Sequence, residues 1–291
     1  MNLMCPARIL LPGELVDAAD GERVAQVYAG PREAAAGTRL AERLGVRLTV
    51  VPELVRRPDE ELLAIADLHR GETVVVLGVD LGLRLPAIVE HTGDGWTRVQ
   101  TDNEVTLASY EQAADKFRAS IPAGPNTLLI DLLASAVPGG RVLELGSGTG
   151  RDAVELERRG FVVRRTDATP AFVELMRADG YDVDRLNAIT DDLGGPYDAV
   201  FADAVFLHFD RAELGHVLRK AAEAAPVLAF STREGSGEEW SNRHLDLPRH
   251  FVLWQEKPLR DLLTTTGWTI QHLERSQTQI GPWLHILAQH T

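Results

Sequence analysis

The sequence predicts an α/β fold in two units, in which a small α/β unit precedes a larger one built on a mostly parallel sheet. From Arg141 onward, short apolar strands alternate with amphipathic helices, the pattern of a parallel sheet with helices on both faces. One strand there runs directly into a glycine-rich turn and a helix. A length of 291 residues is also long for a single domain of roughly 100–200 residues.

The larger unit opens with an expected helix, Thr106–Ile121, and the helix-breaking cluster Pro122-Ala123-Gly124-Pro125. We place the boundary near residue 105, which gives units 1–105 and 106–291. Strands are expected at Arg141–Leu145, Phe161–Arg165, Asp182–Leu186, Tyr197–Ala202 and Val227–Ser231. Helices are expected at Asp152–Arg159, Thr169–Ala178, Arg211–Ala222 and Pro258–Thr265. No helical pattern separates Trp268–Leu273 from Trp283–Gln289, so these strands should pair antiparallel at one edge.

The smaller unit has a weaker α/β rhythm. Arg8–Leu11 is apolar, strands are expected at Arg47–Val51 and Thr73–Leu77, and Thr97–Gln100 closes the unit. Its expected helices are Glu33–Leu44 and Glu60–His69.

Composition excludes several classes of protein. Acidic residues outnumber basic ones 43 to 30, giving a formal charge of −13 that argues against nucleic-acid binding. No segment reaches the roughly 18 consecutive apolar residues of a membrane span, and we read no signal peptide. The only cysteine, Cys5, excludes an internal disulfide framework and a structural zinc cluster. A cytoplasmic, reducing location is expected.

The strongest local signal is Val142–Gly150, where a buried strand leads into Gly146, Gly148 and Gly150. Glycine has no Cβ, so backbone N–H groups and a helix N-terminus can approach a ligand closely at such a turn. A tight turn with a purely structural role has a similar sequence, and short glycine motifs give false positives.

The context of the turn favours a nucleotide cofactor. Asp167 follows the next strand, where α/β nucleotide-binding folds place a carboxylate that binds the ribose hydroxyls. The NAD fingerprint G-x-G-x-x-G needs a third glycine at the position of Arg151. This long charged side chain opposes an NAD-dependent enzyme, which we keep as a weaker alternative.

Together these residues resemble the class I S-adenosylmethionine-dependent methyltransferases, over about residues 107–291. The resemblance is carried by Glu144–Gly150, Asp167, Tyr197–Val200 and the antiparallel final strand. Three further segments are similar to parts of bacterial small-molecule members, namely Tyr110–Phe117, Phe206–Leu214 and Ser231–Glu238. The resemblance implies a Rossmann-like sheet, S-adenosylmethionine as cofactor and S-adenosylhomocysteine as product.

The resemblance also implies the residues of the cofactor site. For the methionine part of the cofactor these are Glu144, Gly146, Ser147, Gly148 and Gly150, with Tyr110 on the covering helix. For the ribose and adenine they are Asp167, Ala168, Thr169, Asn187, Ala188 and Ile189. Under the sulfonium and methyl group they are Asp203 and Ala204. Many relatives carry aspartate in place of Asn187, whose carbonyl can still accept a hydrogen bond from the adenine amino group.

Methyl transfer from a sulfonium mainly requires that the acceptor be aligned with the methyl carbon. An acceptor that carries a proton also needs a base. His208 lies just past the fourth strand of the sheet, and its ordinary pKa of about 6.5 suits proton removal. Local packing or hydrogen bonding is the more common reason for a histidine at such a position.

The polar stretch after the fifth strand carries candidate acceptor-binding residues, Glu238, Glu239, Trp240 and His244. Two carboxylates and an aromatic ring can receive a cationic amine or guanidinium, although a solvated loop has the same composition. His250, Phe251 and Trp254 are candidates for an apolar wall, and core packing is the other interpretation of Phe251. Val205-Phe206-Leu207 should lie buried beside the cofactor.

Residues 8–107 resemble the histidine phosphatase (phosphoglycerate mutase-like) family less specifically, mainly through Gly30–Leu44 and Val46–Leu54. The family's phosphate-accepting histidine falls at Pro12, its helix arginine at Ala34 and its later histidine near Gly78. Proline offers no nucleophile and alanine no charge, so phosphohistidine chemistry is excluded. We interpret the unit as a degenerate, inactive phosphatase domain used for docking, for homodimer formation or for shaping the acceptor site.

The favoured hypothesis is an enzyme that methylates a small molecule, such as an amino acid or a secondary-metabolite precursor. The alternative from another class is a regulatory or scaffold protein that binds S-adenosylmethionine without turnover. No membrane or nucleic-acid partner and no metal are expected, since no spaced carboxylate–histidine set is evident. Scattered ligands can still converge in the fold.

Overall fold

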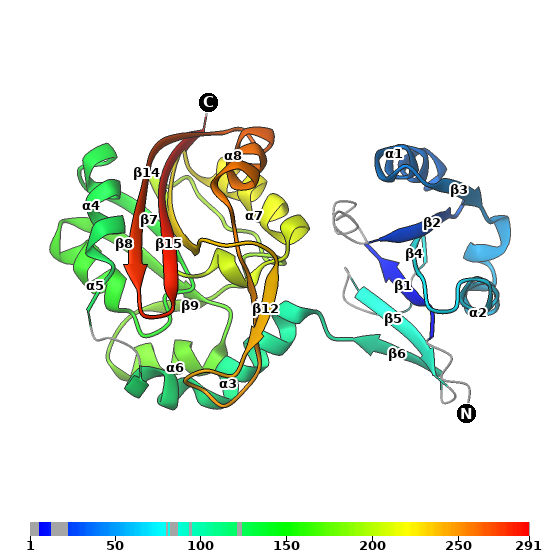
Figure 1. Ribbon diagram of the computed structural model, residues 1–291, viewed down its shortest axis with the longest axis horizontal. Coiled ribbons are helices and arrows are strands. Elements are labelled where there is room, and N and C mark those ends of the chain that lie inside the picture. The colour runs from blue at the N-terminus through cyan, green and yellow to red at the C-terminus, as the bar shows by residue number, and fades with distance from the viewer. Residues whose placement is uncertain are drawn as a thin grey trace. The chain divides into compact units, whose positions relative to one another are not determined.

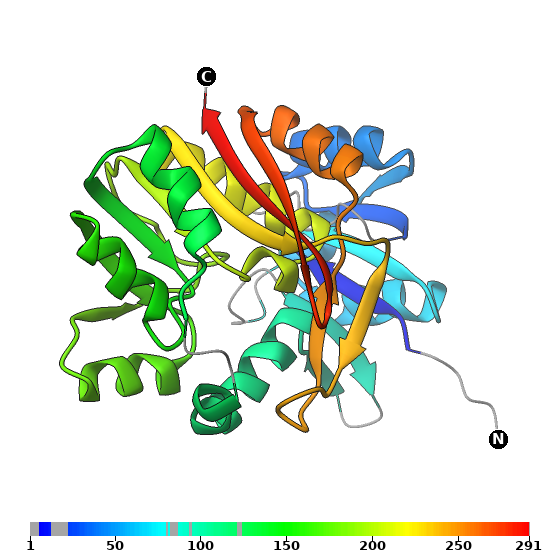
Figure 2. The same cartoon turned by 60° about the vertical axis from the view of Figure 1, so that its left-hand side comes forward.

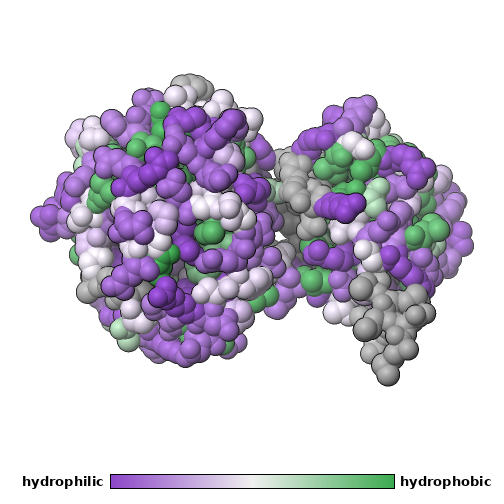
Figure 3. All heavy atoms as spheres, in the orientation of Figure 1, coloured by the Kyte–Doolittle hydropathy of each residue, from purple (hydrophilic) through white to green (hydrophobic). Residues whose placement is uncertain are grey.

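The computed structural model describes residues 6–12, 23–79, 81, 87–92, 95–120 and 124–290. The chain divides into two compact units, Met1–Thr101 and Asp102–Thr291. Cys5, Pro122 and Ala123, which entered the sequence-based expectations, lie outside the described residues. Of the helices that the structure describes, none combines the length and the hydrophobicity needed to cross a lipid bilayer. The faces of the units seen in Figure 3 carry mainly hydrophilic residues, with small hydrophobic patches.

The smaller unit is built on a six-stranded sheet in the order β3-β2-β4-β1-β5-β6. Its strands are β1 (Arg8–Leu11), β2 (Val24–Ala29), β3 (Arg47–Val50), β4 (Thr73–Leu77), β5 (Ala87–Thr92) and β6 (Gly95–Val99). Its helices are α1 (Ala34–Leu44), the 3₁₀ turn η2 (Pro52–Val55) and α2 (Pro58–Leu68). The first four strands in this order are parallel, and β5 and β6 continue the sheet antiparallel.

The side chains of β4 point alternately to the two faces of the small sheet, and one helix covers each face. Val74 and Val76 face the cluster that contains Leu62 of α2, whereas Val75 faces the cluster that contains Leu40 of α1. Since successive side chains of a strand point to opposite faces, α1 and α2 lie on opposite sides of the sheet (Figure 1).

The three positions at which the sequence comparison predicts that phosphatase residues are missing lie at the same end of this sheet. Pro12, Ala34 and Gly78 follow β1, β2 and β4, which are parallel neighbours. The Glu33 carboxylate fills the space there, because a Cβ built on Gly78 would lie 2.3 Å from Glu33 Oε2. The assignment of this unit to the phosphatase family stays a prediction.

The larger unit contains a seven-stranded sheet in the order β14-β15-β11-β10-β7-β8-β9. Five strands run parallel: β7 (Gly140–Leu145), β8 (Phe161–Asp167), β9 (Val183–Arg185), β10 (Ala199–Ala202) and β11 (Val227–Arg233). Strand β15 (Gly281–His290) is antiparallel to β11 and to β14 (Trp268–Thr278). Figure 2 shows this long hairpin in orange to red beside β11 in yellow. The predicted sheet with its antiparallel last strand is confirmed.

Helices cover both faces of this sheet. One layer contains α4 (Thr127–Ala136) and α5 (Arg151–Arg158), and the other contains α7 (Arg211–Ala224) and α8 (Glu256–Thr265) (Figure 1). Val142 and Leu143, adjacent on β7, point into these two different layers. Helix α6 (Pro170–Ala178) packs over β8 and β9. Helix α3 (Asp102–Ser120), interrupted at Ala113, also belongs to this unit.

Several elements differ from the sequence-based expectation. The units separate before α3, at Thr101/Asp102 rather than near residue 105, because the helix begins earlier than its apolar pattern. Helix α4 was not expected. The stretch after β11, interpreted as loop, forms a small hairpin of β12 (Glu238–Ser241) and β13 (Arg249–Val252). A short 3₁₀ turn, η3 (Phe206–His208), follows β10.

Candidate active site

A cavity of about 1170 Å³ lies at the carboxyl ends of β7 and β10, where the strand order of the larger sheet reverses. Ligands of open α/β sheets bind at such a reversal. Drug-sized ligands occupy pockets of roughly 300–1,000 Å³, so this cavity has room for a nucleotide cofactor and a second molecule. The predicted cofactor residues on its wall are Tyr110, Gly146, Ser147, Gly148, Asp167, Ala168, Thr169, Asn187, Ala188, Asp203 and Ala204.

The glycine loop connects β7 to α5 and forms part of the wall. Gly146 and Gly148 have φ values of +64° and +58°, in the left-handed region that glycine adopts without strain. A Cβ built on Gly146 would lie 2.5 Å from Val205 Cγ2, so this glycine is required by close packing. At Gly148 the nearest other atom to such a Cβ is 4.0 Å away, which leaves open space beside the loop.

Asp167 ends β8, next to the glycine loop, and is buried. Its Oδ2 accepts a hydrogen bond from the Gly148 N–H at 2.8 Å, and its Oδ1 accepts one from the Thr169 N–H at 2.8 Å. Burial raises the pKa of Asp167 to about 6, although these hydrogen bonds oppose the shift. A carboxylate offers about four acceptor positions, so each oxygen retains capacity for a ligand hydroxyl.

Glu144, expected beside the amino group of the cofactor, does not line the cavity. Its buried carboxyl lies behind the loop and accepts a hydrogen bond from the Ser147 hydroxyl. Burial, and next the negative charge of Asp152, raise the pKa of Glu144 to about 8. The Glu144 carboxyl is therefore mostly protonated at pH 7, and its hydrogen bond with Ser147 holds the loop to β7.

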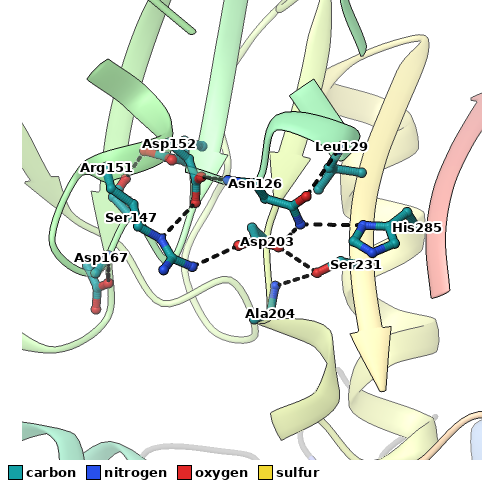
Figure 4. A network of polar contacts seen from close by, with 12 residues as sticks. Asn126, Leu129, Ser147, Arg151, Asp152, Asp167, Asp203, Ala204, Ser231 and His285 are labelled. Carbon is teal, nitrogen blue, oxygen red and sulfur yellow. Dashed lines mark hydrogen bonds and ion pairs between the residues drawn. The ribbon is translucent and has the colours of Figure 1, made fainter. Parts of the chain in front are cut away.

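Asp203, just past β10, is the centre of a polar network (Figure 4). Its Oδ1 accepts hydrogen bonds from Asn126 Nδ2 and from the Ser231 hydroxyl, both at 2.6 Å. Its Oδ2 accepts one from Arg151 Nη2 at 3.1 Å. The network brings together the ends of β10 and β11, the start of α4 and the start of α5.

The network also fixes the backbone beside Asp203. Ala204 has a φ of +57°, which is uncommon for a residue other than glycine, and its N–H donates to the Ser231 hydroxyl at 3.0 Å. Asp152 accepts from the Asn126 N–H at 2.7 Å, and burial and the charge of Asp203 raise the pKa of Asp152 to about 6. The ends of β10 and β11 and the starts of α4 and α5 therefore hold Asp203 and Ala204 in place on the cavity wall.

His208 lies in η3, buried, with both ring nitrogens hydrogen-bonded. Nδ1 lies 2.7 Å from the His250 carbonyl, which only accepts, so Nδ1 carries the proton. Nε2 therefore accepts from the Tyr110 hydroxyl at 2.9 Å. Burial, assisted by the charge of Arg249, lowers the pKa of His208 to about 4. His208 is neutral near pH 7, and its base role stays a prediction.

The sequence profile of a family described as "Methyltransferase domain" matches residues 114–273, more than half of the chain. The chain belongs to this methyltransferase family. The magnesium-protoporphyrin O-methyltransferase of Rhodobacter capsulatus is 27% identical over 160 residues, which cover 49% of this chain and 70% of that protein.

Solved structures share the fold of the methyltransferase unit. The 1,6-didemethyltoxoflavin-N1-methyltransferase of Burkholderia thailandensis, with bound 1,6-didemethyltoxoflavin and S-adenosylhomocysteine, aligns with a TM-score of 0.53 and 18% identity. The alignment covers 72% of this chain and 97% of that chain. The CcbJ methyltransferase of Streptomyces caelestis aligns with a TM-score of 0.51 and 16% identity, covering 63% and 98% of the two chains. The methyltransferase prediction is confirmed, and the predicted cofactor agrees with the S-adenosylhomocysteine bound in the Burkholderia thailandensis structure.

On the expected adenine side of the methyltransferase cavity, Asn187 and Ala188 line the wall and Ile189 does not. Asn187 Oδ1 already accepts a hydrogen bond from the Ile189 N–H at 2.9 Å, which leaves one acceptor position of that oxygen. Gly150 also lies behind the wall, where a Cβ would contact Met176 Sδ at 3.2 Å.

Only some of the predicted acceptor-binding residues line the cavity of the methyltransferase. Glu239 lines the cavity, whereas Glu238 and Trp240 do not, because alternate residues of a strand face opposite sides. His244 lines the cavity from the loop after β12. Glu239 is bound to the Arg233 guanidinium, so it is not a free receptor for a cationic amine.

The remaining wall candidates divide in the same way. Phe251 lines the cavity, whereas His250 and Trp254 are buried behind it. Val205 and Leu207 also line it, whereas Phe206 points into the core.

Sequence reasoning missed some of the wall. Asn126 at the start of α4, Arg249 on β13 and the tip of the β14–β15 hairpin, including Gln277 and Trp283, all contribute. The segments of Asn126 and Gln277 lie more than a hundred residues from each other, and no motif connects them. Arg249 was missed because a single arginine followed by His250, Phe251 and Val252 has no recognisable pattern.

One group of described residues has the composition of a metal site. Ligand atoms of Asp102, Glu238 and His250 lie within 4.8 Å of one another. His250 Nε2 is 3.2 Å from Glu238 Oε2, which an ion pair or hydrogen bond explains without a metal. His250 Nδ1 has no hydrogen-bond partner among the described residues, unlike most metal-bound histidines. The expectation that no metal is used stays a prediction.

Proposed function

We propose that the chain is an S-adenosylmethionine-dependent methyltransferase whose acceptor is a small molecule. The observation that carries this proposal is the single cavity that joins the glycine loop and Asp167 with the β12–β13 hairpin and the β14–β15 tip. Donor and acceptor then share one space. The acceptors named for two relatives, magnesium protoporphyrin and 1,6-didemethyltoxoflavin, are small molecules.

The residues of the cavity fit the proposed cofactor. Gly148 leaves open space where any side chain would intrude, and Asp167 retains acceptor positions for two ribose hydroxyls. The N-terminus of α5 follows the loop directly. We assign the methionine part to the loop, the ribose to Asp167 and the adenine to the segment from Asn187 to Ala188.

When bound, S-adenosylmethionine supplies a methyl group on a positively charged sulfur, which keeps the electron pair of the broken bond as the acceptor forms the new one. The chain's own contribution is alignment. The network around Asp203 and the strained Ala204 fix the wall beneath the proposed methyl group. Proximity and orientation contribute up to roughly 7–11 kcal/mol in favourable cases.

We propose His208 as the base for an acceptor that loses a proton. Its Nε2 lone pair is directed at the Tyr110 hydroxyl, and Tyr110 lines the cavity. As the Tyr110 oxygen takes the proton of the acceptor, its own hydroxyl proton passes to His208 Nε2, and the positive charge then lies on the His208 imidazole. An acceptor that is already ionised needs no such step.

We propose that the smaller unit is a degenerate phosphatase domain that serves in docking or as a homodimer surface. The replacement of its three chemical positions by Pro12, Ala34 and Gly78 supports loss of phosphatase chemistry.

The deciding experiment is turnover. The purified protein is incubated with methyl-labelled S-adenosylmethionine and fractionated metabolite extract, and labelled product and S-adenosylhomocysteine are quantified. We expect a labelled small molecule and an equal amount of S-adenosylhomocysteine. Tight cofactor binding without S-adenosylhomocysteine above the blank, in every fraction, would indicate the regulatory protein instead.

A further inference from the structure

Arg249 places a buried positive charge on the wall of the methyltransferase cavity. The residue is 6% exposed and lines the cavity from β13. Its Nη1 donates to the Tyr110 hydroxyl at 3.3 Å, and its Nη2 donates to the Arg243 carbonyl. Both acceptors are neutral.

No carboxylate of the described residues forms an ion pair with Arg249, and its buried Nε–H has no acceptor among them. Arg165, equally buried in the same unit, binds Glu157 through two hydrogen bonds of 2.7 Å. The chain carries 43 acidic residues against 30 basic ones, so acidic partners are not scarce. A buried charge without a counter-ion is strongly unfavourable, because desolvation is not offset.

Aromatic rings account for part of the environment of this guanidinium. Its central carbon lies 5.5 Å from the ring centroid of Tyr110 and 5.3 Å from that of Phe251. Such contacts favour a cation, but an aromatic ring is not a counter-ion, and the buried Nε–H still has no acceptor among the described residues. The charge of Arg249 also acts on its neighbours: burial raises the pKa of Tyr110 and Arg249 opposes that shift, whereas burial lowers the pKa of His208 and Arg249 adds to that shift.

We propose that Arg249 binds an oxyanion of the acceptor, so that the substrates of this methyltransferase carry a carboxylate or a phosphonate-type group beside an apolar or aromatic body. The proposal deepens the proposed function and rests on it, because it describes the acceptor half of the same cavity. Arginine presents a planar fork that matches an oxyanion with two acceptor oxygens. Phe251 and Tyr110 flank that position and suit an apolar body.

The test uses the full chain saturated with S-adenosylhomocysteine, and three probes of similar shape. Benzoate, phenylphosphonate and the neutral benzamide are titrated at constant ionic strength, and binding is followed by saturation-transfer NMR. We expect at least one of the two anions to bind at least ten times more tightly than benzamide, since hydrogen bonds to charged groups are stronger than those between neutral groups. The preferred anion identifies the oxyanion. Equal binding of benzamide, or no binding of either anion, overturns the proposal.

Variants of single arginines test whether Arg249 causes the preference for an anion. Arg249→Gln should reduce the affinity for the preferred anion at least tenfold, to the level of benzamide, and Arg249→Lys should retain part of the preference. Arg260→Gln removes the same charge from an exposed position of α8 and should bind the anion as the unmodified chain does. If Arg249→Gln does not fold, Arg249→Lys and the three probes on the unmodified chain still decide. An unchanged anion preference in Arg249→Gln contradicts the assignment.

Separate measurements test the proposed function and the proposed role of Arg249. Calorimetric titration with S-adenosylhomocysteine alone tests the cofactor half of the cavity. Failure of that titration removes the proposed function, whereas an intact titration with anion indifference removes only the role of Arg249.

Discussion

The Tyr110 hydroxyl lies 2.9 Å from Nε2 of His208, and the Nδ1–H of the same ring donates to the His250 carbonyl at 2.7 Å. These two contacts fix one neutral tautomer of a buried imidazole. They also connect α3, which carries Tyr110, with η3 and β13. The candidate base is therefore held by elements that are far apart in the sequence.

We expect His208 to remain neutral until the pH falls to about 4, because burial and the charge of Arg249 lower its pKa. Ring-nitrogen NMR should show the Nδ1–H tautomer near pH 7. Arg249→Gln should raise the His208 pKa, since it removes a neighbouring positive charge. A titration midpoint near the ordinary 6.5 in the unmodified chain contradicts this assignment.

Glu144→Gln should change how stability depends on pH. The folded-state pKa of Glu144 is about 8, against 4.5 for the ordinary group, so the folded chain binds more protons than the unfolded chain between these values. The stabilisation is complete below pH 4.5 and is lost as the pH rises toward 8. Glutamine does not titrate, so its stability relative to the unmodified chain should rise by up to about 1.4 kcal/mol per pH unit.

Denaturant unfolding at several pH values measures this difference. Four of the five tryptophans, Trp240, Trp254, Trp268 and Trp283, report on the larger unit. Parallel stability curves for the two proteins between pH 5 and pH 8 would show that Glu144 is ionised in the fold.

Asp167→Ala should weaken the affinity for S-adenosylmethionine by an order of magnitude or more, because it removes a charge-assisted contact to two hydroxyls. Calorimetry measures the affinity. Asp261→Ala, on the exposed side of α8, is the matched control and should bind normally. Unchanged affinity in Asp167→Ala would refute the ribose assignment.

Two loop variants should fail in different ways. Gly148→Val should abolish cofactor binding and leave the smaller unit folded, since its side chain enters the open space of the cavity. The left-handed backbone there costs about 1–2 kcal/mol for a residue with a Cβ. Gly146→Ala should instead destabilise the larger unit, because its Cβ would meet Val205 at 2.5 Å. Calorimetric binding and thermal unfolding distinguish the two effects, and normal binding by Gly148→Val contradicts the loop assignment.

Local signals in the sequence were sufficient to predict the centre of the fold. The buried strand before Gly146, the acidic residue after the second strand and the absence of a helical pattern before Trp283 each depend on neighbouring residues only. The glycine loop that follows the first strand is joined to the acidic residue after the second by a hydrogen bond from the Gly148 N–H to Asp167.

Positions that depend on distant partners were not predictable in the same way. Glu238–Ser241 has no apolar face, and its strand forms only because it pairs with Arg249–Val252. The burial of Arg249 likewise follows from packing against Tyr110 and Phe251. The sequence alone also did not reveal that the side chain of Glu144 lies behind the loop, outside the cavity wall.

Strand β15 lies between β11 and β14, and the cavity wall includes Trp283 and His285 of that strand. During synthesis, β14 therefore has no partner in the sheet until residues 281–290 have emerged from the ribosome. A nascent chain that stalls before Gly281 exposes one edge of β11 and lacks part of the cavity wall. The cavity wall is therefore complete only after this strand has been synthesised.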